Sequence, residues 1–315
     1  MNESASPGES PSDLRARRRR RRRYAVAALV VVVASSAVAV ALGIGRRDVA
    51  RPALTTEHHA ATTIRRARAR ARHFIRSTAA VPILTYHVIA APIANAPFPG
   101  LYVQATEFAA QMRALAASGF HAVTLDEVRA AWSGRRALPR RPIVISFDNG
   151  YRTQYTEALP IMRRLGWVGD ENLQLTGLPP SQGGLSTREV RALVHAGWEL
   201  DTQGNSHADL VTLDAAELRF QIDATRRVLQ RRYGVPVNWF CYPSGRYDAA
   251  VVAEVRHAGF VGSTTVVSGW ARRSDDPYRL PRLRVLGGTS ASALLDEIAA
   301  AQRLPPAPDA YPPGA

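Results

Sequence analysis

Two side chains that can take part in proton transfer or metal binding follow short apolar runs of this sequence. Asp148 directly follows the first of these runs, and His207 stands four positions after Gln203, which ends the second. A carboxylate can accept a proton from an attacking water, and an imidazole can ligate a divalent metal. Both residues also have structural interpretations, because Asp148 can cap a following helix and His207 can hold its loop to Asp209. We favour a site role for Asp148 and keep both interpretations of His207.

The elements that must position these residues alternate between short apolar runs and amphipathic stretches. The predicted strands are 81–87, 121–124, 142–147, 172–175, 198–203, 237–242 and 260–265. The predicted helices are 106–118, 125–132, 151–165, 187–195, 214–233, 248–257 and 290–302. This alternation predicts an α/β fold in which about seven strands form a parallel sheet wound with crossover helices, either open or closed into a barrel.

In such folds the reactive side chains gather at the carboxyl ends of the strands. Polar segments follow the predicted strands in this order: Thr85-Tyr86-His87, Ser146-Phe147-Asp148-Asn149-Gly150-Tyr151, Gln203-Gly204-Asn205-Ser206-His207 and Tyr242-Pro243-Ser244-Gly245. A later segment reads Leu280-Pro281-Arg282.

In their order and spacing these segments resemble the polysaccharide deacetylase family (carbohydrate esterase family 4, the NodB homology domain). The resemblance covers residues 81 to about 295. It implies a distorted (β/α) barrel that removes N- or O-acetyl groups from glycans with the help of a divalent metal, usually zinc. In the family one aspartate is the general base, and a second aspartate and two histidines hold the metal.

Carrying the resemblance over residue by residue gives a mixed site. Asp148 matches the general base and His207 matches one metal-binding histidine. Asn149 and Gln203 stand where the other aspartate and histidine belong, and neutral amides are poor zinc ligands. We predict that Asn149 and Gln203 hydrogen-bond to each other without metal. The resemblance further implies substrate contacts from Tyr151, Tyr242, Pro243, Ser244 and Gly245, and it leaves His87 without a role.

Three functions therefore stay open. One is an enzyme that deacetylates a cell-envelope glycan, and another is a pseudoenzyme that binds such a glycan without metal chemistry. A third, weaker possibility is a different hydrolysis that uses Asp148 without a metal. Cys241 is interpreted as a small core residue. Of the tryptophans, Trp198 and Trp239 are expected to pack in the core, whereas Trp270, in an expected loop, is the better candidate for stacking on a sugar.

The amino-terminal arm carries most of the positive charge. The formal net charge is +15, of which residues 1–76 contribute +12 and residues 77–315 only +3. Because the folded part is nearly balanced, no nucleic-acid partner is expected. Eight arginines up to Arg23 precede an uncharged stretch of 21 residues from Tyr24 to Ile44. At 1.5 Å per residue, this stretch has about the length needed to cross a bilayer.

The sequence thus predicts a basic cytoplasmic tail (1–23), a transmembrane helix (24–44), a basic linker (45–80), the deacetylase-like domain (81–302) and a disordered tail (303–315). Positive charge before the apolar stretch places the domain outside the cell in a single-pass cell-membrane protein. The alternative is a cleaved signal peptide with a small-residue site at Ala37-Val38-Ala39.

Overall fold

The computed structural model describes residues 80–176, 178 and 183–311. The predicted basic tail, the predicted transmembrane helix Tyr24 to Ile44 and the linker up to residue 79 lie outside these residues, so they stay predictions. Within the described ranges, no helix has both the length and the apolar character that a membrane crossing requires.

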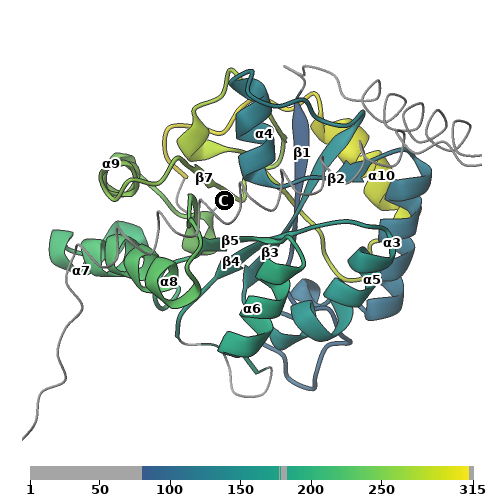
Figure 1. Cartoon of the computed structure of the whole chain (residues 1–315), viewed down its shortest axis with the longest axis horizontal. Helices are drawn as coiled ribbons and strands as arrows, with labels where there is room; N and C mark the ends of the chain where they lie inside the picture. Colours follow the sequence, from purple (N-terminus) through teal and green to yellow (C-terminus); the bar gives the residue numbers. More distant parts are fainter. Residues whose placement is uncertain (1–79, 177, 179–182, 312–315) are drawn as a thin grey trace, which may run out of the picture. The chain divides into compact units, whose positions relative to one another are not determined.

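The described residues form an α/β half-barrel built mainly from parallel strands (Figure 1). The strands are β1 (Val81–Tyr86), β2 (His121–Ala122), β3 (Pro142–Asn149), β4 (Asp170–Leu173), β5 (Glu199–Thr202), β6 (Trp239–Cys241), β7 (Gly262–Thr264), β8 (Trp270–Ala271) and β9 (Leu283–Arg284). Their order in the sheet is β7-β6-β5-β4-β3-β1-β8, with β2 beside β3 and β9 beside β1. Only β8 runs antiparallel to its neighbour among these pairs. The predicted α/β class is confirmed.

Helices cover the sheet and connect its strands (Figure 1). The α-helices are α3 (Ala105–Ala117), α4 (Leu125–Trp132), α5 (Leu159–Arg164), α6 (Thr187–His195), α7 (Ala215–Arg219), α8 (Thr225–Tyr233), α9 (Ala249–His257) and α10 (Ala291–Ala301). The π-helical turns η2 (Gln154–Ala158) and η4 (Phe220–Ala224) lead into α5 and α8. Short 3₁₀ turns are η1 (Pro99–Leu101), η3 (Leu210–Thr212), η5 (Pro243–Gly245) and η6 (Pro277–Arg279).

The two faces of the sheet differ in character because side chains alternate along each strand. On the face that packs against helices, Tyr86, Phe147 and Trp198 form aromatic contacts within one core cluster. The opposite face carries polar side chains in register: Ser146 pairs with Asp170, and Asp148 pairs with Asn172. We call this opposite face the inner face.

The segment 280–285 links the two sides of the sheet. Leu280 exchanges backbone hydrogen bonds with Ser263 and Thr265 beside β7, and the Val285 amide donates to Thr85 on β1. The segment therefore crosses the inner face from β7 toward β1, as expected for a barrel-like arrangement, and it carries Arg282 inward.

The carboxyl-terminal segment, predicted to be disordered over residues 303–315, is described by the structure up to residue 311. Over residues 303–311 it lies against the domain, where the Tyr311 amide donates to the Tyr247 carbonyl at 3.0 Å and Tyr247 Oη donates to the Pro308 carbonyl at 2.8 Å. A proline-rich stretch keeps its carbonyl oxygens as acceptors, so an extended segment can be fixed by donors of the domain.

Candidate active site

Asp148 lies at the carboxyl end of β3 in a two-point salt bridge with Arg282. Arg282 Nη1 donates to Asp148 Oδ1 at 2.8 Å, and Nη2 donates to Oδ2 at 2.9 Å. Both side chains are almost completely buried, with 2% of Asp148 and 1% of Arg282 exposed. Such fork-shaped pairing fixes the carboxylate in one orientation.

Three further groups surround the Asp148 carboxylate. Asn172 Nδ2 donates to Oδ1 at 2.9 Å, and the Cys241 thiol lies 3.5 Å from Oδ2. His87 Nε2 lies 4.0 Å from the same oxygen. None of these contacts comes from the amide of a following helix, so Asp148 belongs to a side-chain cluster and does not act as the helix cap that was the alternative.

The ion pair determines the charge of the cluster. Burial raises the pKa of Asp148, but the charge and hydrogen bonds of Arg282 outweigh burial and hold the pKa well below its usual range. Burial lowers the pKa of His87 to about 4, although the Asp148 charge opposes the shift. At neutral pH the cluster therefore contains an ionised Asp148, a charged Arg282 and a neutral His87.

Arg282 itself is anchored from several directions. Its Nε donates to the Thr265 carbonyl at 2.8 Å, Nη1 to Ser146 Oγ at 3.2 Å and Nη2 to Cys241 Sγ at 3.2 Å. The sequence marked Leu280-Pro281-Arg282 only as a late family-like element and gave Arg282 no partner. The pairing joins residues 134 positions apart, which a local pattern cannot indicate.

Cys241 is buried, as predicted for a core residue, but it also contacts both members of the ion pair. Burial raises the pKa of its thiol well above the usual range, and the Asp148 charge adds to this while Arg282 opposes it. A thiol in this state is not a nucleophile.

The predicted hydrogen bond between Asn149 and Gln203 is wrong. Asn149 Nδ2 donates instead to Gln174 Oε1 at 2.8 Å. The reason is the strand order, because β4 lies between β3 and β5 and places Gln174 beside Asn149. Gln203 Oε1 is buried and has no hydrogen-bond partner among the described residues.

The residues at this edge do not fit a zinc ion. Zinc sites use about four ligands, chiefly histidine, cysteine and carboxylate. Within residues 80–176, 178 and 183–311, no three such side chains converge around His207. Both Asp148 oxygens already accept from Arg282, and the Asn149 amide is engaged by Gln174.

His207 is partly buried, and burial lowers its pKa, so its ring is neutral at neutral pH. Asp209 forms a salt bridge with Arg246 at 2.6 Å. No hydrogen bond joins the side chains of His207 and Asp209 in the described part of the chain, although the structural interpretation of His207 predicted one. The charge of Asp148 raises the pKa of His207 and so opposes the effect of burial.

Left-handed backbone conformations mark the same edge. Asn149, His207 and Ser244 have φ values of 77°, 57° and 52°. Such conformations cost a non-glycine residue roughly 1–2 kcal/mol and concentrate at functional sites. Three predicted site residues from three separate segments of the chain share this property, which supports a functional role for the edge.

The predicted substrate-binding residues differ in accessibility. Ser244 is exposed and Tyr151 is partly buried, whereas Tyr242, Pro243 and Gly245 are buried. The Tyr242 hydroxyl donates to the Tyr278 carbonyl at 2.9 Å, and its ring stacks on Tyr247. Burial raises the pKa of Tyr151 and raises that of Tyr242 well above its usual value. The contact of these residues with a sugar stays a prediction.

The tryptophan expected to stack on a sugar lies elsewhere. Trp270 is on β8, in register with Pro82 at the amino end of β1, and its Nε1 donates to the Ile298 carbonyl at 2.8 Å. It is therefore fixed at the sheet end opposite Asp148. Trp198 and Trp239 are buried in the core as predicted.

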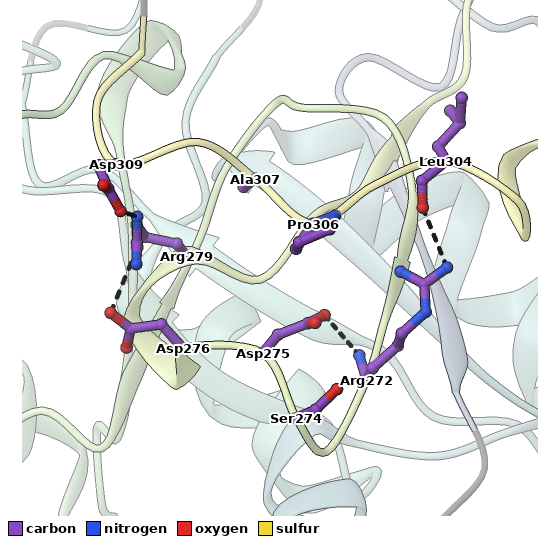
Figure 2. Close-up of a pocket in the computed structure, with 9 residues that line it drawn as sticks. All are labelled: Arg272, Ser274, Asp275, Asp276, Arg279, Leu304, Pro306, Ala307 and Asp309. Atoms are coloured by element: carbon purple, nitrogen blue, oxygen red, sulfur yellow. Dashed lines mark hydrogen bonds and ion pairs between the residues drawn. The ribbon is translucent and has the colours of Figure 1, made fainter.

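A cavity of about 450 Å³ lies between the loop after β8 and the carboxyl-terminal segment (Figure 2). Its lining residues are Arg272, Ser274, Asp275, Asp276, Arg279, Leu304, Pro306, Ala307 and Asp309. The charged groups pair with one another and with the backbone, as in the contacts of Arg272 with Leu304 and of Arg279 with Asp309 (Figure 2). None of the predicted site residues lines this cavity.

Comparison with known proteins agrees with the sequence resemblance. The family model described as polysaccharide deacetylase matches residues 135–263. The chain is 24% identical over 215 residues to the "Putative polysaccharide deacetylase YxkH" of Bacillus subtilis (strain 168), covering 68% of this chain and 75% of that protein. It is 22% identical to the poly-beta-1,6-N-acetyl-D-glucosamine N-deacetylase of Escherichia coli (strain K12), covering 60% of this chain and 34% of that protein.

Among solved structures, the fold is similar to the deacetylase PplD of Streptococcus pyogenes in complex with acetate. The TM-score is 0.64 at 21% identity, over 70% of this chain and 99% of that one. The motif order, the parallel half-barrel and these similarities agree. Over residues 135–263 the chain thus matches the polysaccharide deacetylase family, at low identity to the relatives named above.

Proposed function

We propose that this protein is a slow N- or O-deacetylase of an acetylated cell-envelope glycan. The observation that carries the proposal is Asp148, held ionised by Arg282 at the carboxyl edge of a deacetylase fold. In the proposed reaction a water attacks the acetyl carbonyl and Asp148 takes the proton of that water. Asp148 then passes the proton to the sugar nitrogen or oxygen as its bond to the acetyl carbon breaks, which releases the acetyl group as acetic acid and restores the amine or hydroxyl.

The geometry indicates a low rate. A base works best when its pKa is near the operating pH, whereas the pKa of Asp148 is far below it. Its carboxylate is also 2% exposed and is engaged by Arg282. Among the described residues, no group of three metal-binding side chains lies at this edge, so a metal-assisted reaction is not supported there.

A second candidate function follows from the Asn149–Gln174 hydrogen bond. That bond occupies the amide that replaces a metal-binding carboxylate. It favours a pseudoenzyme that binds the acetylated glycan and does not hydrolyse it.

Acetate release from N-acetylglucosamine oligomers, combined with a binding assay on the same oligomers, separates the two functions. Release by the wild type that Asp148→Asn abolishes supports the deacetylase. Binding without release supports the pseudoenzyme. Absence of both binding and release would contradict both candidates for this glycan class. Tyr155→Phe, which changes a partly buried residue outside the edge, is the control for both readouts.

The proposed location is the cell membrane, with the amino terminus in the cytoplasm and the domain on the outer side. Support comes from the sequence alone, namely the arginine run before Tyr24 and the uncharged stretch to Ile44. Protease accessibility of the domain in intact cells tests this. Digestion of the domain from outside is expected, and protection until lysis would contradict the topology.

A further inference from the structure

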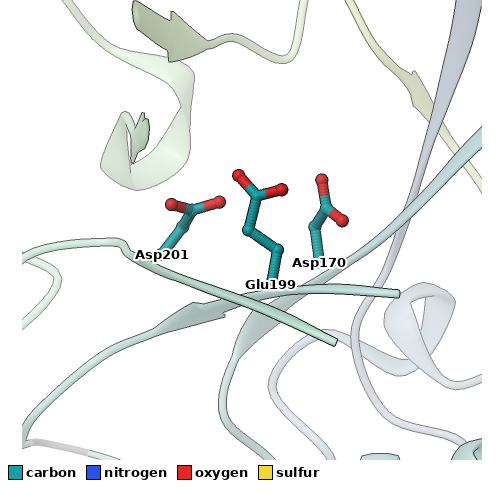
Figure 3. Close-up of side chains that lie close together, drawn as sticks. All are labelled: Asp170, Glu199 and Asp201. Carbon is teal, nitrogen blue, oxygen red and sulfur yellow. The ribbon is translucent and has the colours of Figure 1, made fainter. Parts of the chain in front are cut away.

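A second group of carboxylates lies on the inner face of the sheet, on β4 and β5. Asp170 comes from β4, and Glu199 and Asp201 come from β5. One oxygen atom from each side chain lies within 4.8 Å of the others. Figure 3 shows the three carboxylates side by side on the same side of their strands.

Backbone amides fix one oxygen of each carboxylate. The Leu125 amide donates to Asp170 Oδ2 at 2.9 Å, the Asp126 amide to Glu199 Oε2 at 3.0 Å and the Trp239 amide to Asp201 Oδ1 at 2.9 Å. The donors come from the start of α4 and from β6. The orientation of the three acids is therefore determined by the surrounding backbone.

The other oxygen of each carboxylate accepts no hydrogen bond from a donor group among the described residues. Asp170 Oδ1, Glu199 Oε1 and Asp201 Oδ2 are buried atoms of this kind, and Asp170 and Asp201 are completely buried as residues. The side chains of Glu199 and Asp201 contact each other, so these two acids meet only another acid there. None of the ion pairs within the described ranges includes these three acids. Buried polar atoms are normally satisfied, and an unpartnered buried carboxylate is costly, so the group lacks a positively charged partner.

A fourth acid nearby is already satisfied. Asp126 Oδ2 accepts from Asn238 Nδ2 at 2.6 Å, and its Oδ1 accepts from Trp239 Nε1 at 3.2 Å. The unpartnered oxygens thus belong to Asp170, Glu199 and Asp201 alone in this cluster, and Asp126 is not counted as a ligand.

We propose that Asp170, Glu199 and Asp201 bind one hard divalent cation of the Ca²⁺, Mg²⁺ or Mn²⁺ class. These ions prefer carboxylate oxygens, whereas zinc prefers nitrogen and sulfur. Two oxygens that ligate the same Ca²⁺ at about 2.4 Å are at most about 4.8 Å apart, which the observed spread satisfies. Glu199 is partly exposed and gives the ion access from solvent.

A bound cation would stabilise the domain by linking β4 to β5. Because the Leu125, Asp126 and Trp239 amides donate to the same three acids, it would also stabilise the start of α4 and β6. Asp170 lies two residues, about 7 Å, before Asn172, which donates to Asp148. The ion would therefore stabilise the strand that carries an Asp148 partner. This inference does not depend on the proposed hydrolysis.

The test is calorimetric titration of the full-length chain, solubilised in detergent and stripped with a chelator, against Ca²⁺, Mg²⁺ and Mn²⁺ separately. We expect one ion per chain and, at a free ion concentration 100 times Kd, a rise in Tm of about 5–10 °C. The double variant Asp170→Asn, Asp201→Asn should lose the response. Glu199→Gln, a single change at a partly exposed position, should bind at least about 10-fold more weakly.

Asp223→Asn, which removes a partly exposed acid on η4, is the matched control and should bind like the wild type. If the double variant does not fold, Glu199→Gln decides the question. The proposal is overturned if the wild type binds none of the three ions at one per chain, or if Glu199→Gln binds as tightly as the wild type. Either result would mean that the acids share protons in place of a cation.

Discussion

Two regions of the inner face carry the same residue types in different electrostatic settings. At the carboxyl edge, Asp148 is buried against the two-point contact of Arg282. On β4 and β5, Asp170 and Asp201 are equally buried but contact only neutral amides and other acids. Because the aspartates of both regions are buried, burial does not distinguish them. The difference is the presence of one guanidinium.

That difference reverses the direction of the pKa shifts. Burial favours the neutral acid at both places, but Arg282 outweighs it and lowers the pKa of Asp148. On β4 and β5 burial raises the pKa of Asp170 and Asp201 well above the usual range, and the neighbouring charge of Glu199 raises it further. A buried carboxylate therefore needs its own cation to stay charged.

Removing the guanidinium is expected to have the largest effect. Arg282→Met leaves the Asp148 charge buried without a partner, so the free energy of unfolding should fall by about 3–5 kcal/mol. Urea denaturation followed by circular dichroism measures the loss. Arg284→Met, an exposed arginine two residues away, should change stability by less than about 0.5 kcal/mol.

Adding Asp148→Asn to Arg282→Met should restore part of the lost stability, because the uncompensated charge is removed. An Arg282→Met single variant as stable as the wild type would show that the ion pair does not stabilise this edge.

The acid group should make stability fall as the pH rises in chelated protein. Burial and then the charge of Asp126 raise the pKa of Glu199 from 4.5 to about 8. Between these values the folded state holds a proton that the unfolded state has released. The stabilisation is therefore complete below about pH 4.5 and is lost as the pH passes through about 8.

The size of the change is about 1.4 kcal/mol for each tenfold difference in proton affinity between the folded and unfolded states. The measurement is the difference in unfolding free energy between the wild type and Glu199→Gln across this pH range, with a chelator present. A difference that stays constant with pH would contradict a raised pKa for Glu199.

His87 should give a smaller effect of opposite sign. Its pKa falls from 6.5 to about 4 on folding because it is buried. The unfolded state binds the proton first, so stability is complete above about pH 6.5 and falls as the pH decreases toward 4. In His87→Phe the free energy of unfolding should fall less than in the wild type as the pH decreases from 6.5 to 4, as measured by denaturation curves at each pH. Here too, each tenfold difference in proton affinity corresponds to about 1.4 kcal/mol. The same pH dependence of stability in His87→Phe and in the wild type would mean that folding does not hold His87 neutral.

The sequence predicted the helices that have strong local signals. The bounds of α4 and α6 agree with the predicted ranges 125–132 and 187–195. Both helices begin with a capping box, formed by Thr124 with Glu127 and by Ser186 with Glu189. These interactions span three residues, so the information that sets the helix start is local.

The bounds of β4, which carries Asp170 of the acid group, were predicted less well. The predicted strand began at residue 172, but β4 begins at Asp170 because β3 and β5 pair with it on both sides. Aspartate and glutamate are rare in strands, so local propensity argued against this start. The two most informative features of the inner face, the Arg282–Asp148 pair and the Asp170–Glu199–Asp201 group, both join residues that are distant in sequence. The sequence identified Asp148 and His207 but not these partners.

We propose that the carboxyl edge cannot complete a zinc site because Asn149 and Gln203 stand at two positions where the family resemblance places metal ligands. The most direct test is the zinc content of the wild type and of the double variant Asn149→Asp, Gln203→His after exposure to zinc and gel filtration. We predict no stoichiometric zinc in the wild type and about one ion per chain in the variant, bound at an edge completed by His207. One zinc per wild-type chain that His207→Ala removes would contradict the claim.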